Sequence, residues 1–171
     1  EVLEHAVMDI STIKETANIA TKASFNLKVT SIKQDFFEFM EGYIAEVVSN
    51  DTRWGMKVAF NNSNKLKLEK SFKPAEACIL FVNLIENARK SNARSFTVDC
   101  NENSMSFIDD GDGFDFDRLP PQSYMEKGVT TTIEGSGLGL YHCAKIANSL
   151  NATISIENNN DKGAKINLEF K

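Results

Sequence analysis

The stretch NLIENARK, residues 83–90, is followed along the chain by two glycine-rich turns, DDGDG at 109–113 and GSGLGL at 135–140. A fourth segment, KGVTTT at 127–132, lies between the two turns. Each segment alone is a common helix or loop fragment. In this order they indicate a nucleotide site that is assembled from separated parts of the chain.

The first segment belongs to a helix that is expected from Pro74 to about Asn92, because proline is well tolerated in the first turn of a helix. Asn83, Asn87 and Lys90 stand at i, i+4 and i+7 and therefore share one face. A second face is apolar and can anchor the helix to a sheet, through Ala77, Phe81, Leu84 and Ala88. Taken alone, such a polar stripe is more often a solvated helix face. The neighbouring glycine motifs favour the interpretation that it lines a cleft.

The rest of the chain alternates short apolar runs with polar turns, which predicts six strands around this helix. The strands are expected at Met56–Phe60, Leu66–Phe72, Phe96–Cys100, Met105–Asp109, Thr153–Glu157 and Lys165–Phe170, and a further helix at Gly137–Leu150. This order predicts an α/β (α+β) two-layer sandwich, in which helices cover one face of a mixed, largely antiparallel sheet. The sequence contains no G-x-x-x-x-G-K-[ST] phosphate loop, so a doubly wound nucleotide fold is not expected.

The segment 111–133 shows no sustained period and contains two consecutive prolines, Pro120 and Pro121. It therefore predicts a long loop, and loops of this length inside a compact domain are usually functional.

The N-terminal part of the chain has a different pattern. Its apolar and small residues follow the alternating three-four spacing of a heptad seam, at Leu3, Ala6, Ile10, Ile13, Ala17, Ala20, Ser24 and Leu27. A second helix is expected to start at Ser31, where Ser31 and Gln34 form a capping-box pattern. The seam indicates either a homodimer through these helices or an amphipathic helix that packs on its own domain. The chain is accordingly divided into a helical segment and linker, 1–49, and a nucleotide-binding domain, 50–171.

Composition limits the classes of function. The 24 acidic and 19 basic side chains give a net charge of -5, so no electrostatic attraction to nucleic acid is expected. Three cysteines without a C-x-x-C spacing indicate free thiols in a reducing compartment rather than disulfides or a zinc site. No apolar run approaches the ~20 residues that span a bilayer. A cytoplasmic location is expected, which leaves open a membrane anchor elsewhere in a parent protein.

The four segments resemble the N box, G1 box, lid and G2 box of the Bergerat-fold ATPases, the GHKL superfamily. They are most similar to the catalytic, ATP-binding domain of sensor histidine kinases, and the resemblance covers roughly residues 50–171. It implies that the chain binds ATP with Mg²⁺ and transfers the γ-phosphoryl group to a histidine. It also implies a two-component system, with a response regulator receiver domain as a partner.

The resemblance assigns roles to residues of the first two segments. Asn87 stands at the position of the family's Mg²⁺ ligand, and an amide oxygen is suited to that ion. Lys90 resembles the lysine that reaches toward phosphate. Asp109 is the position that accepts a hydrogen bond from the adenine amino group, while Gly111 and Gly113 let the backbone turn and approach the base.

The other two segments are expected at the phosphate chain. The G2 motif precedes a helix, so its N–H groups can point at phosphate from the positive helix end. Its residues are Gly135, Ser136, Gly137, Leu138, Gly139 and Leu140. The lid motif supplies one ammonium and several hydroxyls, from Lys127, Thr130, Thr131 and Thr132, unless these belong to an ordinary surface loop.

One departure from the hydrolysing members of the family concerns mechanism. Those members commonly carry a glutamate, as general base, four residues before the metal asparagine, and here that position is Asn83. An amide cannot accept a proton from water at neutral pH, so efficient hydrolysis by this route is not expected. Asn83 is therefore the position in the catalytic centre where this chain resembles histidine kinases.

The phosphoacceptor is expected on another helix, upstream of Glu1. His5 is followed by Ala6 rather than by an acidic residue, and His142 on the second predicted helix is interpreted as a packing residue. Two other functions remain open: a nucleotide-gated GHKL interaction module, and an ATPase of the topoisomerase or mismatch-repair type without histidine phosphotransfer. Asn83 and the acidic net charge speak against the last.

Overall fold

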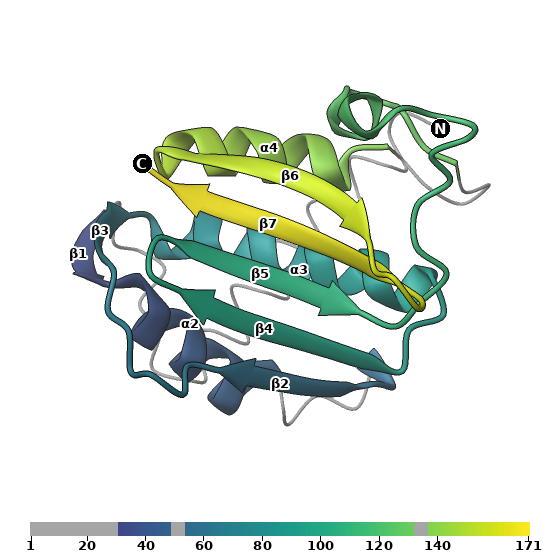
Figure 1. Ribbon diagram of the computed structural model, residues 1–171. Helices are drawn as coiled ribbons and strands as arrows, with labels where there is room; N and C mark the ends of the chain where they lie inside the picture. Colours follow the sequence, from purple (N-terminus) through teal and green to yellow (C-terminus); the bar gives the residue numbers. More distant parts are fainter. Residues whose placement is uncertain (1–30, 49–53, 132–136) are drawn as a thin grey trace.

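The structure is a computed structural model that describes residues 31–48, 54–131 and 137–171. Its centre is a five-stranded sheet in the order β2-β4-β5-β7-β6 (Figure 1). The strands are β2 (Lys57–Asn61), β4 (Ser95–Asn101), β5 (Ser104–Asp109), β6 (Ala152–Asn158) and β7 (Ala164–Phe170). β2 and β4 run parallel, and the three other neighbouring pairs of this sheet are antiparallel.

Two helices, α3 (Pro74–Lys90) and α4 (Gly139–Ser149), lie behind the sheet in Figure 1 and pack against each other. Side chains of a strand alternate between the two faces of a sheet, and here the inward ones are apolar. Phe81 of α3 meets Phe96 and Phe107 of the sheet, with ring centroids 5.7 and 6.4 Å apart. All three rings are almost fully buried, and each contributes about 1.5–3 kcal/mol of hydrophobic stabilisation. The predicted two-layer sandwich is confirmed.

The prediction of a helix start at Ser31 is wrong. Residues Ile32–Asp35 form β1, which pairs antiparallel with β3 (Glu69–Phe72). The helix α2 (Phe36–Tyr43) begins only after Asp35, whose carboxylate accepts hydrogen bonds of 3.0 Å from the N–H groups of both Phe37 and Leu68. Asp35 thus caps the helix and ties it to the chain before β3, a pairing that the local pattern around Ser31 does not contain.

The segment after β1 is part of the same hydrophobic core as α3. The buried side chains of α2 are Phe36, Phe37, Phe39, Met40 and Tyr43, and a π-helical turn, η1 (Ile44–Val48), continues it. The core therefore extends to residues before 49, although the division of the chain at 49 and 50 itself remains a prediction. The heptad segment and His5 lie outside the described residues.

Other element boundaries differ from the predicted ones for local reasons. β3 begins at Glu69 rather than at Leu66, because the Asn62 side chain binds the N–H and C=O of Leu66, at 2.8 and 2.9 Å. Gly137 has a left-handed φ of 67°, and α4 starts two residues later, at Gly139. The long loop contains a short 3-10 helix, η3 (Pro121–Met125), that the sequence pattern did not indicate.

Candidate nucleotide-binding site

The polar face of α3 meets the glycine-rich turn at the start of α4. A Cβ atom added at Gly139 would lie 3.6 Å from Asn87 Oδ1 and 4.0 Å from Asn83 Oδ1. Both asparagines are half-buried, whereas Lys90, the last residue of α3, is exposed. The structure thus brings Asn83, Asn87 and Gly139 together, from segments more than 50 residues apart.

Asn83 has an unsatisfied donor. Its Nδ2 atom is buried and makes no hydrogen bond with any described residue. The amide lies beside the Cys143 sulfur, which is only a weak acceptor. Buried amide donors are usually paired, so this one marks a place where a further acceptor would be favourable.

Asp109 ends β5 and is only 8% exposed. One of its oxygens, Oδ1, accepts hydrogen bonds from the N–H groups of Gly111 at 2.8 Å and Ala164 at 3.3 Å. Burial raises the pKa of the Asp109 carboxyl above its ordinary value, and the nearby charges of Asp110 and Asp112 act in the same direction, while the two N–H groups oppose them. The site therefore contains a buried acceptor whose second oxygen is not used by these two bonds.

The turn after Asp109 is closed onto the C-terminal end of α3. The Asp112 N–H donates to the Ser91 carbonyl at 2.8 Å, and a Cβ at Gly111 would overlap that same carbonyl. Asp110 accepts from the N–H groups of Arg94 and Ser95, at 2.7 and 2.9 Å, at the start of β4. These contacts explain why a glycine is needed at 111 and hold the DDGDG turn beside the helix that carries the asparagines.

The turn between β6 and β7 also holds Asp109, a contact that was missing from the sequence interpretation. Asn159 Nδ2 donates to the Asp109 carbonyl at 3.0 Å. Gly163 has a φ of 95° and lies so close to that carbonyl that any Cβ would overlap it. In the sequence, the run NNNDKG at 158–163 is typical of an ordinary polar hairpin turn, so no local signal separated these residues from other loops.

The lid segment and the second glycine motif touch through their backbones. The Gly128 N–H donates to the Gly137 carbonyl at 3.0 Å, and a Cβ at Gly137 would overlap Gly128 and Val129. Lys127 is exposed and Thr131 half-buried. Leu138 is the residue before α4, and its apolar side chain does not cap the helix. Leu140, in the first turn of α4, is half-buried. Thr132, Gly135 and Ser136 lie outside the described residues.

The part of the long loop that precedes the lid segment contains an aromatic cluster. Phe114 and Phe116 stack with centroids 5.6 Å apart, and Phe114 meets Tyr124 edge-on at 5.0 Å. The Tyr124 hydroxyl donates to the Asp115 carbonyl at 2.9 Å and lies 3.0 Å from the Asp115 N–H. The cluster packs the chain after Gly113 against η3.

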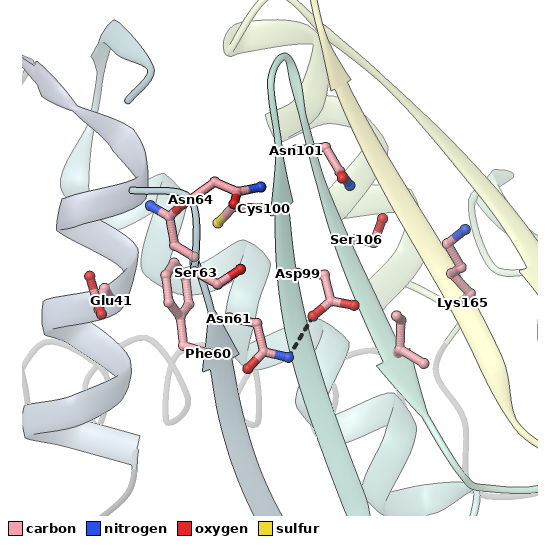
Figure 2. A pocket seen from close by; sticks show the side chains of 12 residues that line it. Glu41, Phe60, Asn61, Ser63, Asn64, Asp99, Cys100, Asn101, Ser106 and Lys165 are labelled. Carbon is pink, nitrogen blue, oxygen red and sulfur yellow. Dashed lines mark hydrogen bonds between the residues drawn. The ribbon is translucent and has the colours of Figure 1, made fainter. Parts of the chain in front are cut away.

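A hollow of about 750 Å³ lies elsewhere, on the face of the sheet opposite to α3 and α4. Figure 2 shows its polar lining, in which Asn61 donates to Asp99 at 2.8 Å. No residue of the four motifs lines it. The hollow is therefore separate from the candidate nucleotide site.

The donor set around α3 is compatible with a magnesium ion that shares its coordination shell with phosphates. Among the described residues no group of three or more His, Cys, Asp or Glu side chains could hold a metal ion. Mg²⁺ usually takes one or two protein oxygens, with phosphates and water completing its shell. The Asn87 oxygen facing the Gly139 turn fits that requirement.

None of the helices within residues 31–48, 54–131 and 137–171 has the length and apolar character of a membrane-spanning segment.

Comparison with known proteins gives the family. Residues 73–171 match the model described as histidine kinase-, DNA gyrase B-, and HSP90-like ATPase. The chain belongs to this family. The match contains α3, both glycine-rich turns and the lid segment, so the four motifs lie inside the ATPase domain. No curated protein sequence matches the chain.

Solved structures share the fold at low sequence identity. The nucleotide-free catalytic domain of the histidine kinase ThkA is similar with a TM-score of 0.64 and 18% identity, over 83% of this chain and 97% of that one. The ATP-binding domain of PrrB from Mycobacterium tuberculosis gives 0.62 and 19%, over 83% and 97%. Full-length ShkA in complex with AMPPNP gives 0.67 and 15%, over 99% of this chain and 37% of that one. The fold of this family member is thus that of histidine kinase catalytic domains.

Proposed function

We propose that this ATPase-family domain binds Mg-ATP between α3 and α4 and transfers the γ-phosphoryl group to a histidine, as the catalytic domain of a two-component sensor histidine kinase. The observation that carries the proposal is the approach of Gly139 to Asn83 and Asn87 on α3, with the turn after the buried Asp109 in contact with Ser91 at the C-terminal end of the same helix. Asp109 would then supply an acceptor for the base, and Gly139 would leave space for phosphates at the start of α4.

Each end of the nucleotide has suitable partners. The free Asp109 oxygen would accept from the adenine amino group, an interaction that guanine, with a carbonyl at that edge, does not offer. The first N–H groups of α4 would face the phosphates at the positive end of the helix. Positive charge and hydroxyl donors would come from Lys90, Lys127, Thr131 and Thr132. The residues around the phosphate chain would also include Gly135, Ser136 and Leu138.

Magnesium would be held through Asn87 and the phosphates, and it would neutralise charge on the transferred group. The protein contributes mainly positioning and charge stabilisation in this reaction. Asn83 cannot remove a proton from water, so the described site favours a separate acceptor over hydrolysis. Because Ala6 rather than an acidic residue follows His5, we place the acceptor on a helix of another segment. A receiver domain would take the phosphoryl group next.

Two wider aspects belong to the same proposal. The heptad seam at residues 3–27 would form a homodimer and bring an acceptor helix to the ATP site of a partner. We place the activity in the cytoplasm, because ATP is the donor and because Cys78, Cys100 and Cys143 are free thiols. Burial raises the pKa of each of these thiols to about 12, which keeps them protonated and unreactive.

The test is phosphoryl transfer from γ-labelled ATP. The chain alone should incorporate little label and release phosphate slowly, and His5→Gln should change neither value. A longer form of the protein that carries an acceptor helix should give a product that is labile in acid and stable in base. Fast phosphate release by the chain alone would favour a hydrolysing ATPase.

The second candidate is a nucleotide-gated interaction module. The backbone contact between Gly128 and Gly137 favours it, because a ligand at the glycine turn would act directly on the lid. This function predicts ATP-dependent partner binding without any label on a histidine, in either form of the protein.

A further inference from the structure

Asn158 joins two parts of the chain that are far apart in sequence. It ends β6, opposite Ala164 of β7. Its Oδ1 accepts from the Phe114 N–H at 2.7 Å, and its Nδ2 donates to the Phe114 carbonyl at 2.8 Å. One side-chain amide thus satisfies both backbone groups of one residue, as a neighbouring strand would.

Phe114 is the residue at which the chain leaves the glycine turn and continues through the long loop toward the lid segment. On its N-terminal side, Gly113 has a φ of 77°, and a Cβ there would be 2.8 Å from Asn158 Oδ1. On its C-terminal side, the Phe114 ring packs on Phe116 and Tyr124. The Asn158 amide therefore fixes the point at which the chain leaves the turn that follows Asp109.

Asn159, the next residue, contacts the other end of the glycine-rich turn. Asn159 Nδ2 binds the Asp109 carbonyl, so the two asparagines hold the segment 109–114 at both ends. Neither contact involves the side chain of Asp109, and both come from the end of β6 and the turn that follows it, outside the four motifs.

We propose that Asn158 is a positioning residue of the nucleotide site, acting through the backbone of Phe114 on the base pocket. This inference rests on the proposed function of Mg-ATP binding. A structural role of Asn158 limited to the hairpin would lower stability and leave the relative affinities of ligands unchanged.

The test compares four forms of the chain by calorimetric titration with Mg-ATP, with chemical denaturation as a second readout. Asn158→Ala removes both hydrogen bonds and should lower ATP affinity about tenfold, the equivalent of about 1.4 kcal/mol. Asn158→Asp keeps an acceptor for the Phe114 N–H but loses the donor. Its ATP affinity should lie between those of Asn158→Ala and the unmodified chain. Asn160→Ala, an exposed residue of the same turn, is the matched control and should bind like the unmodified chain.

A second probe separates the two ends of the site. Inorganic triphosphate with magnesium, measured as a competitor, reports the phosphate end alone, so Asn158→Ala should change its affinity less than that of ATP. Equal ATP affinity in Asn158→Ala and the unmodified chain would overturn the inference while leaving the proposed function intact. An equal loss for both ligands would also overturn it. Absence of ATP binding by the unmodified chain would overturn the proposed function and this inference together.

Discussion

The two ends of the candidate site are built in different ways. The base end depends on side chains and backbone groups that bind one another: Asp109 accepts from two N–H groups, and Asn158 and Asn159 hold the backbone on either side. The described part of the phosphate end depends on missing side chains, because Gly139 leaves space in front of Asn83 and Asn87. Crowding the closely packed base end should therefore destabilise the fold, whereas changes at the phosphate end should weaken nucleotide binding without destabilising the fold.

The largest effect is expected where a glycine is needed at the base end. Gly163→Ala would place a methyl group against the Asp109 carbonyl at a φ of 95°. Backbone strain and overlap should together reduce the free energy of unfolding by about 3 kcal/mol or more. Gly55→Ala is the matched control, since Gly55 has a φ of 63° but no atom within 4 Å, and should lose only about 1 kcal/mol. Denaturation curves with similar losses for both variants would contradict the packing argument.

The metal position gives the next prediction. Asn87→Ala removes the oxygen that faces the glycine turn, and should weaken ATP binding in the presence of magnesium by about tenfold, or about 1.4 kcal/mol. Binding in the presence of a chelator should change much less. Equal losses with and without magnesium would make Asn87 a structural residue.

Adding one methyl group should separate stability from binding at the phosphate end. A Cβ at Gly139 would make only an ordinary contact of 3.6 Å with Asn87, and alanine is a better helix residue than glycine. Gly139→Ala should therefore raise the free energy of unfolding by about 0.4–1 kcal/mol. It should also lower ATP affinity, because the methyl group fills the space before α4. Unchanged affinity would mean that the phosphates do not approach this turn.

The smallest effect is the pH dependence of stability. Burial raises the pKa of Asp109 in the folded chain, so the ionised carboxylate destabilises the fold above that pKa, and the destabilisation is lost as the pH falls below the pKa of the unfolded chain. Asp109→Asn keeps an Oδ1 acceptor and carries no charge. It should be at least as stable as the unmodified chain at pH 7, and the difference should shrink in acid. A difference in the free energy of unfolding that grows in acid would contradict a raised pKa of Asp109.

The sequence predicted the fold well because its signals are local. The strands were predicted from the alternation of apolar and polar residues, and α3 from its apolar face. The four motifs predicted which segments form the site. β1 was missed because its partner β3 lies more than 30 residues away, and because Ser31 and Gln34 imitate a capping box. Asn158 and Gly163 were missed for a related reason: their importance depends on the approach of the β6–β7 turn to Asp109, and no pattern within the turn records it.

The central claim is that Asp109 recognises the adenine of ATP, and calorimetric titration of Asp109→Asn tests it most directly. A hydrogen bond to a charged group contributes about 1.5–3 kcal/mol, so the variant should bind Mg-ATP about tenfold more weakly or worse. Its affinity for GTP should change little, because guanine offers no amino group at that edge. Equal ATP affinities in the variant and the unmodified chain, with both folded, would contradict the assignment of this pocket to the base.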